Sequence, residues 1–294
     1  MKIGFIGLGM MGYPMAHLLA QAGYPLTVMD LSADATARFA AEHGAAVVAS
    51  GIDDFRQVEL VITMLPDSNA VEAILLGEAG RPGLHSVLPQ GATVIDMSSS
   101  EPMRSRTLEA TLAQKGLRYL DAPVSGGVKR AVDGSLAIMV GGDADVLSRC
   151  ADVLKVMGKN FTHVGQAGAG HAMKALNNYV SAAGLAATVE ALHVGSAFGL
   201  DPAAMVAVLN SSTGKNNTTE NKVNQFMLSG KFNSGFSLGL MAKDLGIAMG
   251  LGKSLGQTMD LGDEVLQIWR AADAALGKGA DHTALYRYLK KDAL

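Results

Sequence analysis

Cysteine and excess charge are both scarce in this chain of 294 residues. Cys150 is its single cysteine, so the chain can form no internal disulfide framework and no cysteine-rich zinc site. One cysteine fits a reducing compartment, and we expect a cytoplasmic protein. Charged residues make up 17% of the chain, and 24 basic against 27 acidic residues give a formal net charge of −3. This balance provides no electrostatic footprint for a nucleic acid or an anionic membrane.

Long apolar runs are also missing. The most apolar stretch, residues 175–200, has Glu190 as its only charge, but asparagine, serine, threonine and histidine interrupt it. A membrane span needs about 20 predominantly apolar residues, so we interpret this stretch as a helix buried in protein. Residues 1–12 lack the ordered regions of a signal peptide. We therefore expect neither a membrane nor a nucleic acid as a partner.

Glycine, in contrast, is abundant, with 35 residues, and the first half of the chain alternates short apolar runs with helical patterns. Such alternation predicts parallel βαβ units and a doubly wound sheet. After Gly170 the pattern is helical only, which indicates a second domain. We expect strands at 2–6, 25–29, 61–65, 93–95, 117–120, 136–140 and 161–164, and helices at 10–21, 33–42, 68–76 and 101–114.

The predicted fold class is an α/β Rossmann doubly wound parallel sheet plus an all-α C-terminal domain. A long helix that begins near Ala169 is expected to bridge the two. We place the boundary between the two domains at residue 164, so that the first covers residues 1–164 and the second residues 165–294.

A glycine-rich loop follows the first predicted strand and opens the first predicted helix. It has the form G-x-G-x-x-G, in which Gly7 allows the tight turn, Gly9 lets backbone approach a pyrophosphate, and Gly12 allows close helix–strand packing. The helix N-terminus adds N–H groups for the phosphates. We expect the whole loop to contact a dinucleotide cofactor: Gly7, Leu8, Gly9, Met10, Met11 and Gly12.

Asp30 ends the second predicted strand, about 20 residues after the loop, where the ribose-binding acid of this fold belongs. A carboxylate there accepts hydrogen bonds from both ribose hydroxyls and repels a 2′-phosphate. Leu31 and Ser32 supply no arginine for that phosphate, so the sequence favours NAD, with NADP possible. Asp30 could instead cap the next helix, although Ser32 already fits that cap.

Two further motifs carry polar groups. Residues 121–127 read Asp-Ala-Pro-Val-Ser-Gly-Gly, in which backbone N–H groups beside the Ser125 hydroxyl suit a carboxylate; a plain strand-end turn is the alternative. Lys174 and Asn178 share one face of the bridging helix. Desolvation among small apolar residues would lower the pKa of Lys174 towards the range of proton transfer, whereas a lone lysine is otherwise a solvated surface group.

Together with Met-Ala-Lys-Asp-Leu at residues 241–245, these motifs resemble those of the β-hydroxyacid dehydrogenase family, which includes 3-hydroxyisobutyrate dehydrogenase and tartronate semialdehyde reductase. The resemblance covers nearly the whole chain, with the motifs in the family's order. It implies that Lys174 is the catalytic lysine and that the substrate is held by Ser125, Gly126, Gly127 and Asn178.

The resemblance also implies cofactor contacts outside the glycine loop. Leu65 and Pro66 match the family's Leu-Pro beside the adenosine half, and Lys243 matches a lysine near nicotinamide and substrate. Ser99 stands where the family usually has a threonine beside the nicotinamide ribose, and the hydroxyl is retained. The family further implies a homodimer or homotetramer built mainly from the helical half.

We therefore expect an NAD-dependent oxidoreductase that interconverts a small β-hydroxy acid and its semialdehyde, with Lys174 as general acid and base. An NADPH-linked tartronate semialdehyde or glyoxylate-type reductase is the alternative within the class. A non-catalytic dinucleotide-binding scaffold is the alternative from another class. The seven histidines are scattered, with no H-E-x-x-H motif, so the sequence predicts no metal centre.

Overall fold

The computed structural model of the protein describes residues 1–78, 80–277 and 279–290. The chain forms two compact units, Met1–Lys174 and Ala175–Leu294, here called the N-terminal and C-terminal units. The division falls within helix α7 (Ala169–Phe198), whose start near Ala169 agrees with the predicted bridging helix. The predicted domain boundary at residue 164 stays a prediction.

The N-terminal unit alternates strands and helices up to the start of α7. Its strands are β1 (Ile3–Ile6), β2 (Leu26–Met29), β3 (Val47–Val48), β4 (Leu60–Thr63), β5 (Gly77–Glu78), β6 (Arg81–Pro82), β7 (Thr93–Asp96), β8 (Arg118–Asp121), β9 (Val124–Ser125), β10 (Ala137–Gly142) and β11 (Asn160–Gly165). Its helices before α7 are α1 (Gly12–Gln21), α2 (Ala33–Glu42), α3 (Ser68–Leu76), α4 (Pro102–Gln114), α5 (Gly127–Val132) and α6 (Ala144–Met157), with 3₁₀ turns at Ile52–Phe55 and Leu84–Ser86.

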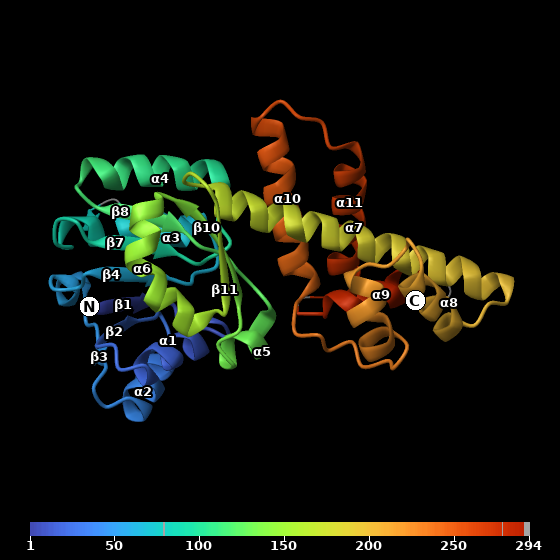
Figure 1. Cartoon of the computed structure of the whole chain (residues 1–294), viewed down its shortest axis with the longest axis horizontal. Coiled ribbons are helices and arrows are strands. Elements are labelled where there is room, and N and C mark those ends of the chain that lie inside the picture. The colour runs from blue at the N-terminus through green and yellow to red at the C-terminus, as the bar shows by residue number, and fades with distance from the viewer. Residues whose placement is uncertain (79, 278, 291–294) are drawn as a thin grey trace. The chain divides into compact units, whose positions relative to one another are not determined.

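The main sheet of this unit has the strand order β3-β2-β1-β4-β7-β8, with every neighbouring pair parallel (Figure 1). The order reverses direction between β1 and β4, and in open α/β sheets ligands bind beyond the carboxyl ends of the strands at such a switch point. The Rossmann prediction is therefore confirmed.

The far side of the sheet departs from the predicted parallel arrangement. Strand β10 runs antiparallel to β8 and to the short β9, while β11 runs parallel to β10. Only residues 126–136 join β9 to β10, and a parallel crossover needs a dozen or more residues. The short connection therefore turns the chain back on itself.

Helices cover both faces of the sheet, because successive strand residues point to opposite faces. On β1, Ile3 and Phe5 join a core cluster with residues of α1, α2 and α6. Ile6 points to the other face, where the cluster includes residues of α3 and α4. The near-continuous apolar strands are thus buried on both sides, as a parallel sheet requires.

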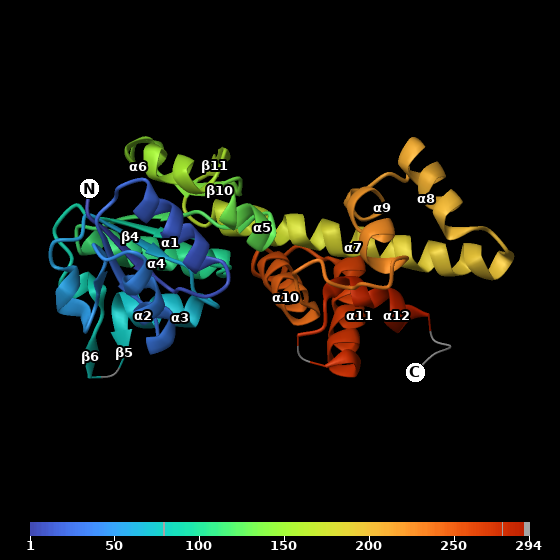
Figure 2. The same cartoon turned by 90° about the horizontal axis from the view of Figure 1, so that it is seen from below.

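The C-terminal unit is helical. Apart from an isolated bridge between Ser237 and Asp281, no strand occurs in its described residues, 175–277 and 279–290. Trp269 lies fully buried in its core, and α10 and α11 pack side by side (Figure 2). Besides α7 its elements are α8 (Pro202–Ser211), α9 (Asn217–Asn221), a π-helical turn (Val223–Met227), α10 (Leu238–Ser254), α11 (Asp260–Leu276), a 3₁₀ turn (His282–Ala284) and α12 (Leu285–Leu289).

None of the helices in the described part of the chain combines the length and the apolar character that a membrane-spanning segment needs. This includes α7, whose residues 182, 185, 186, 189 and 192 are buried in the core of the C-terminal unit.

Candidate active site

The glycine loop lies between β1 and α1, beside the switch point of the sheet. Gly7 has a φ of +98°, and a side chain there would collide with the carbonyl oxygen of Met64 beyond β4. A side chain on Gly12 would collide with the carbonyl oxygen of Gly7, whereas a Cβ on Gly9 would meet nothing within 4 Å. The loop is therefore packed tightly at both ends and open in the middle, which is the shape that a pyrophosphate site requires.

The side chains of the loop point in different directions. Leu8 is buried in the core and Met11 packs against it, whereas Met10 is 72% exposed. Met11 occupies the N-cap position of α1 and makes no side-chain cap hydrogen bond. The first turn of α1 thus offers its backbone, and not a side-chain cap, to an anion.

Asp30 lies directly after β2, and its carboxylate links the glycine loop to the turn that precedes α2. Its Oδ2 accepts a hydrogen bond from the Leu8 N–H (2.5 Å), and its Oδ1 accepts one from the Ser32 N–H (2.7 Å). A carboxylate has about four lone-pair sites, so two remain for ribose hydroxyls. Ser32 caps α2 by accepting from the Ala35 N–H (3.2 Å), which leaves Asp30 available.

Leu65, Pro66 and Ser99 follow the carboxyl ends of the neighbouring strands β4 and β7. The Leu65 N–H donates to the Ser98 hydroxyl (2.9 Å), which joins the two loops beyond these strands. Ser99 is partly exposed, between the buried Ser98 and Ser100. The residues predicted to contact the cofactor in this unit thus follow β1, β2, β4 and β7, which are adjacent in the sheet.

Lys174 contacts the segment 121–127. Its Nζ donates a hydrogen bond of 2.7 Å to the carbonyl oxygen of Val124, the residue before Ser125. Gly126 and Gly127 follow with φ values of +137° and +69° and are exposed. The structure therefore brings the predicted catalytic amine to the same short segment as the predicted carboxylate site.

Asp121, at the end of β8, holds the first turn of α7. Its fully buried carboxylate accepts from the Gly168 N–H (2.7 Å) and from the His171 N–H (2.8 Å). Side chains on Gly141 or Gly170 would collide with atoms of Asp121, so both glycines allow this close approach. A carboxylate at a helix N-terminus stabilises it through the free N–H groups and the helix dipole. Asp121 thereby fixes the turn from which Lys174 projects.

His171 connects this carboxylate to a second one. The ring of His171 is fully buried, with Nδ1 2.8 Å from the Ser105 hydroxyl and Nε2 3.1 Å from the carbonyl oxygen of Ser98. The same nitrogens lie 3.7 Å from Asp121 and 3.8 Å from Asp96. Both ring nitrogens are thus hydrogen-bonded, as a buried imidazole requires.

Asp96, at the end of β7, is satisfied by hydroxyl and backbone groups. Thr63 Oγ1 and the Ser98 N–H donate to its Oδ1 (2.9 and 3.0 Å), and Ser100 Oγ donates to its Oδ2 (2.7 Å). Burial and then the charges of Asp96 and Asp121 raise the pKa of Tyr119 well above its usual 10. The tyrosine therefore remains a neutral hydroxyl in this network.

The C-terminal unit contains a smaller buried polar pair. The amide of Asn178 donates to Asp244 Oδ2 at 2.6 Å, and both side chains are buried. The neighbouring Lys243 is partly exposed, with Nζ 4.0 Å from Asp244 Oδ1. The two site residues predicted in this unit are thus joined through Asp244, which sequence reasoning did not select although it is a charge within an apolar helix.

Sequence reasoning also missed Asp96, Asp121 and His171 as site residues. Asp96 and Asp121 directly follow the predicted strands 93–95 and 117–120, which is a signal for an edge position. The distant donors to these carboxylates, Thr63, Gly168 and His171, lie 33 to 50 residues away in the chain. Met97, next to Asp96, is buried in the core.

Comparison with known proteins matches two family models to successive parts of the chain. Residues 2–165 match the family described as the NAD binding domain of 6-phosphogluconate dehydrogenase. Residues 168–289 match the family described as NAD-binding of NADP-dependent 3-hydroxyisobutyrate dehydrogenase.

Several relatives are similar along nearly their whole length. Mitochondrial 3-hydroxyisobutyrate dehydrogenase of Bos taurus is 36% identical, over 99% of this chain and 87% of its own. The 2-hydroxy-3-oxopropionate reductase of Escherichia coli is 34% identical, over 99% and 97%. The solved structure of Mycobacterium tuberculosis 3-hydroxyisobutyrate dehydrogenase with L-serine has a TM-score of 0.90 and 34% identity, covering 98% of this chain and 99% of that one.

The sheet with its switch point, the glycine loop beside it and the family matches define an NAD(P)-dependent oxidoreductase with a Rossmann fold. The resemblance found in the sequence is confirmed over nearly the full length of the chain. The chain belongs to the β-hydroxyacid dehydrogenase family.

Proposed function

We propose that this enzyme interconverts a small β-hydroxy acid and its semialdehyde, with Lys174 as general acid and base and NAD as the preferred cofactor. The observation that carries the proposal is the hydrogen bond from Lys174 Nζ to the Val124 carbonyl, because it brings the amine beside Ser125, Gly126 and Gly127. The similarity to 3-hydroxyisobutyrate dehydrogenases supports the substrate class.

The chemistry follows from the groups in this segment. Bound NAD supplies the hydride acceptor or donor. The Ser125 hydroxyl and the N–H groups of Gly126 and Gly127 would hold the substrate carboxylate and thereby orient the carbon beside it. Lys174 Nζ would accept the hydroxyl proton during oxidation and return it to the carbonyl oxygen during reduction. Two further residues belong to the proposed site. We assign Asn178 to orienting the substrate and Lys243 to contacting the cofactor.

The cofactor proposal rests on the geometry around the glycine loop. The open space at Gly9 suits a pyrophosphate, and the two remaining acceptor sites of Asp30 suit ribose hydroxyls. The negative charge of Asp30 disfavours a 2′-phosphate, which gives the preference for NAD. We assign the adenosine half to Leu65 and Pro66, and the nicotinamide ribose to Ser99.

A substrate panel tests this function. We would measure turnover with 3-hydroxyisobutyrate, L-serine and 2-hydroxy-3-oxopropionate, each with the NAD and the NADP forms of the cofactor. We expect the highest kcat/KM for a β-hydroxy acid with NAD. Absence of hydride transfer with all three, despite binding of NAD, would favour the non-catalytic scaffold.

The second candidate function is an NADPH-linked tartronate semialdehyde or glyoxylate-type reductase. The 34% identity to the Escherichia coli 2-hydroxy-3-oxopropionate reductase favours it. In the same panel, a higher kcat/KM for reduction of 2-hydroxy-3-oxopropionate with NADPH would replace the first candidate by this one.

The predicted homodimer or homotetramer and the cytoplasmic location belong to this proposal. Large apolar side chains are exposed on the helices of the C-terminal unit, among them Val180, Val194, Phe198 and Val208, at 63–84%. Val194 and Phe198 lie four residues apart on α7 and therefore share one face of the helix, which serves as an association surface in this proposal. We expect light scattering to give a mass of two or four chains, and Phe198→Asp to lower it.

A further inference from the structure

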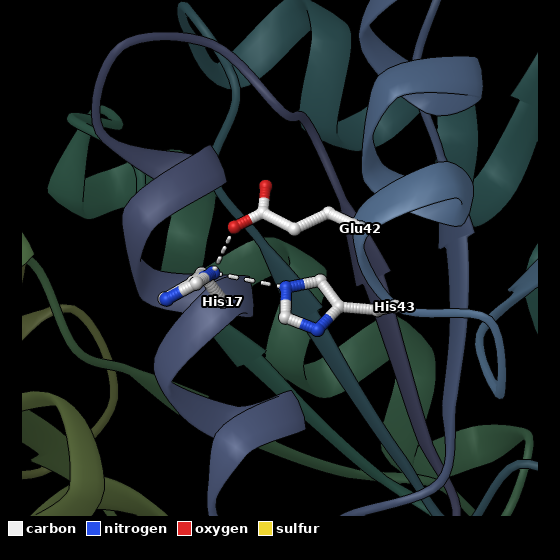
Figure 3. Close-up of side chains that lie close together, drawn as sticks. All are labelled: His17, Glu42 and His43. Atoms are coloured by element: carbon white, nitrogen blue, oxygen red, sulfur yellow. Dashed lines mark hydrogen bonds and ion pairs between the residues drawn. The ribbon is translucent and has the colours of Figure 1, made fainter.

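Two histidines that lie 26 residues apart in the sequence meet in the N-terminal unit (Figure 3). His17 lies on α1, and His43 is the C-cap residue of α2; His17 Nδ1 is 2.9 Å from His43 Nε2. The same Nδ1 is 3.0 Å from Oε1 of Glu42, the last residue of α2. One ligand atom from each of the three residues lies within 4.8 Å of the others.

The three ligand atoms are His17 Nδ1, His43 Nε2 and Glu42 Oε1. Too few protons lie between them for each lone pair to accept a hydrogen bond. His17 Nδ1 carries at most one hydrogen, yet both the Glu42 carboxylate and His43 Nε2 lie within hydrogen-bond distance. If His17 Nδ1 holds the proton, these two acceptors compete for it. If His43 Nε2 donates instead, the lone pair of His17 Nδ1 faces the carboxylate. A divalent cation would accept an electron pair from each of the three.

The carboxylate of Glu42 is already oriented. Its Oε2 accepts a hydrogen bond from the Tyr13 hydroxyl (2.6 Å), which leaves Oε1 directed at His17. Tyr13 is itself held by the Arg38 guanidinium, 4.0 Å from the centre of its ring. Such an outer partner, which fixes the orientation of a ligand, is typical of metal sites.

We propose that His17, Glu42 and His43 form a binding site for a divalent transition-metal ion of the zinc type. Two imidazoles and one carboxylate are an established zinc ligand set, with water in the fourth position. The side chains of His17 and Glu42 are 29% and 44% exposed, so an ion has access. Sequence spacing did not predict this site, because its histidines come from different helices.

The ion would join α1 to α2 and so stabilise the part of the sheet that binds the cofactor. Helix α1 begins at the glycine loop, and α2 begins just after Asp30. His17 lies five residues beyond Gly12, about 7.5 Å along the helix axis, so the ion is separated from the phosphate-binding turn. Its role is structural and adds to the proposed reaction without taking part in it.

Zinc titration of the tag-free, metal-stripped chain tests this site. By calorimetry we expect one Zn²⁺ per chain with a Kd of about 10 µM or lower. His17→Ala and His43→Ala should each weaken binding by at least about 100-fold, and Tyr13→Phe by about 10-fold, because outer partners contribute less than ligands. Zn²⁺ should raise the Tm of the wild-type chain and leave that of His17→Ala unchanged.

Two variants keep the test decisive. Glu42→Gln preserves the size of the side chain and an oxygen that can accept from Tyr13, but removes the negative charge. We expect this variant to lose zinc binding while its Tm without metal stays equal to that of the wild type. His163→Ala removes an exposed histidine of β11 in the same unit and should leave binding intact. The proposal is overturned if Zn²⁺ binds no more tightly than about 100 µM, if His17→Ala and His43→Ala retain full binding, or if His163→Ala weakens it equally.

Discussion

The two units use polar residues in different ways. The N-terminal unit buries two carboxylates, Asp96 and Asp121, in a network with His171 and several hydroxyls at the carboxyl ends of its central strands. The C-terminal unit buries the pair Asn178–Asp244 and exposes large apolar side chains on its helices. A buried charge is tolerated only where it is satisfied. The N-terminal unit uses its buried carboxylates to fix the start of one helix, α7, whereas the C-terminal unit buries an amide–carboxylate pair between two of its helices.

The largest effect should come from the last residue of the N-terminal unit. Lys174→Ala should lower kcat by about 10²–10⁴-fold, because no group replaces the amine in proton transfer. The affinity for NAD should change little, since the glycine loop and Asp30 are untouched. Steady-state kinetics and NAD titration measure the two effects separately.

Lys155→Ala is the matched control, because this exposed lysine pairs with the exposed Asp152 on the surface of α6. It should leave kcat unchanged. If Lys174→Ala loses affinity for NAD but turns over at the normal rate, the proposed role of Lys174 is wrong.

Asp121→Asn should destabilise the N-terminal unit by about 2–4 kcal/mol. The amide can accept only one of the two N–H groups from the start of α7, so the other is left buried without a partner. Urea unfolding followed by circular dichroism measures the loss. Asp152→Asn, an exposed carboxylate in the same unit, should change stability by less than about 0.5 kcal/mol; equal effects of both substitutions would contradict the fastening role.

In the C-terminal unit, stability should fall as the pH drops from about 6.5 to about 4. Burial, followed by the positive charge of Lys222, lowers the pKa of His282 from 6.5 to about 4. The unfolded chain therefore binds a proton first as the pH falls, and the loss can reach about 3 kcal/mol. Buried His282 Nε2 has no hydrogen-bond partner in the described structure, so a proton there would be uncompensated.

Trp269, the only tryptophan in the sequence, lies in this unit, so its fluorescence follows C-terminal unfolding. His282→Gln should flatten the pH dependence between pH 6.5 and 4. If the stability of this variant depends on pH as that of the wild type does, a group other than His282 causes the loss of stability.

The smallest expected effect concerns cofactor choice. Asp30→Ala should reduce the preference for NAD over NADP by about tenfold, or about 1.4 kcal/mol, because a repulsive charge near the 2′ position is removed. The ratio of kcat/KM values for the two cofactors measures it. Asp34→Ala, four residues further on and exposed, is the control. If wild type and Asp30→Ala give equal ratios, the proposed contact between Asp30 and the ribose is wrong.

Much of the fold could be predicted because local signals agree with the tertiary structure. Helices α2 and α3 have the predicted ends, since Ser32 and Asp67 cap their first turns with side-chain hydrogen bonds. Two-residue strands such as β3 and β9 are too short for any alternation to be seen. The bounds of helix α6 were not predicted although Asp143 caps it, because its apolar residues lie between two predicted strands.

The predicted site was limited by sequence separation. The glycine loop and Lys174 are part of local motifs, so their positions could be read from the chain. The partners of Asp121 lie 47 and 50 residues away, and His17 meets His43 only through the packing of α1 on α2. Such pairings depend on tertiary contacts that no short pattern encodes.

Residues 121–127 have a consequence for enzyme engineering. Within seven positions this segment anchors the start of α7 through Asp121, receives the Lys174 amine through Val124, and ends in two glycines with positive φ. An insertion or deletion there would disturb all three features at once. Mutant libraries that seek new substrates should therefore keep its length and vary positions elsewhere.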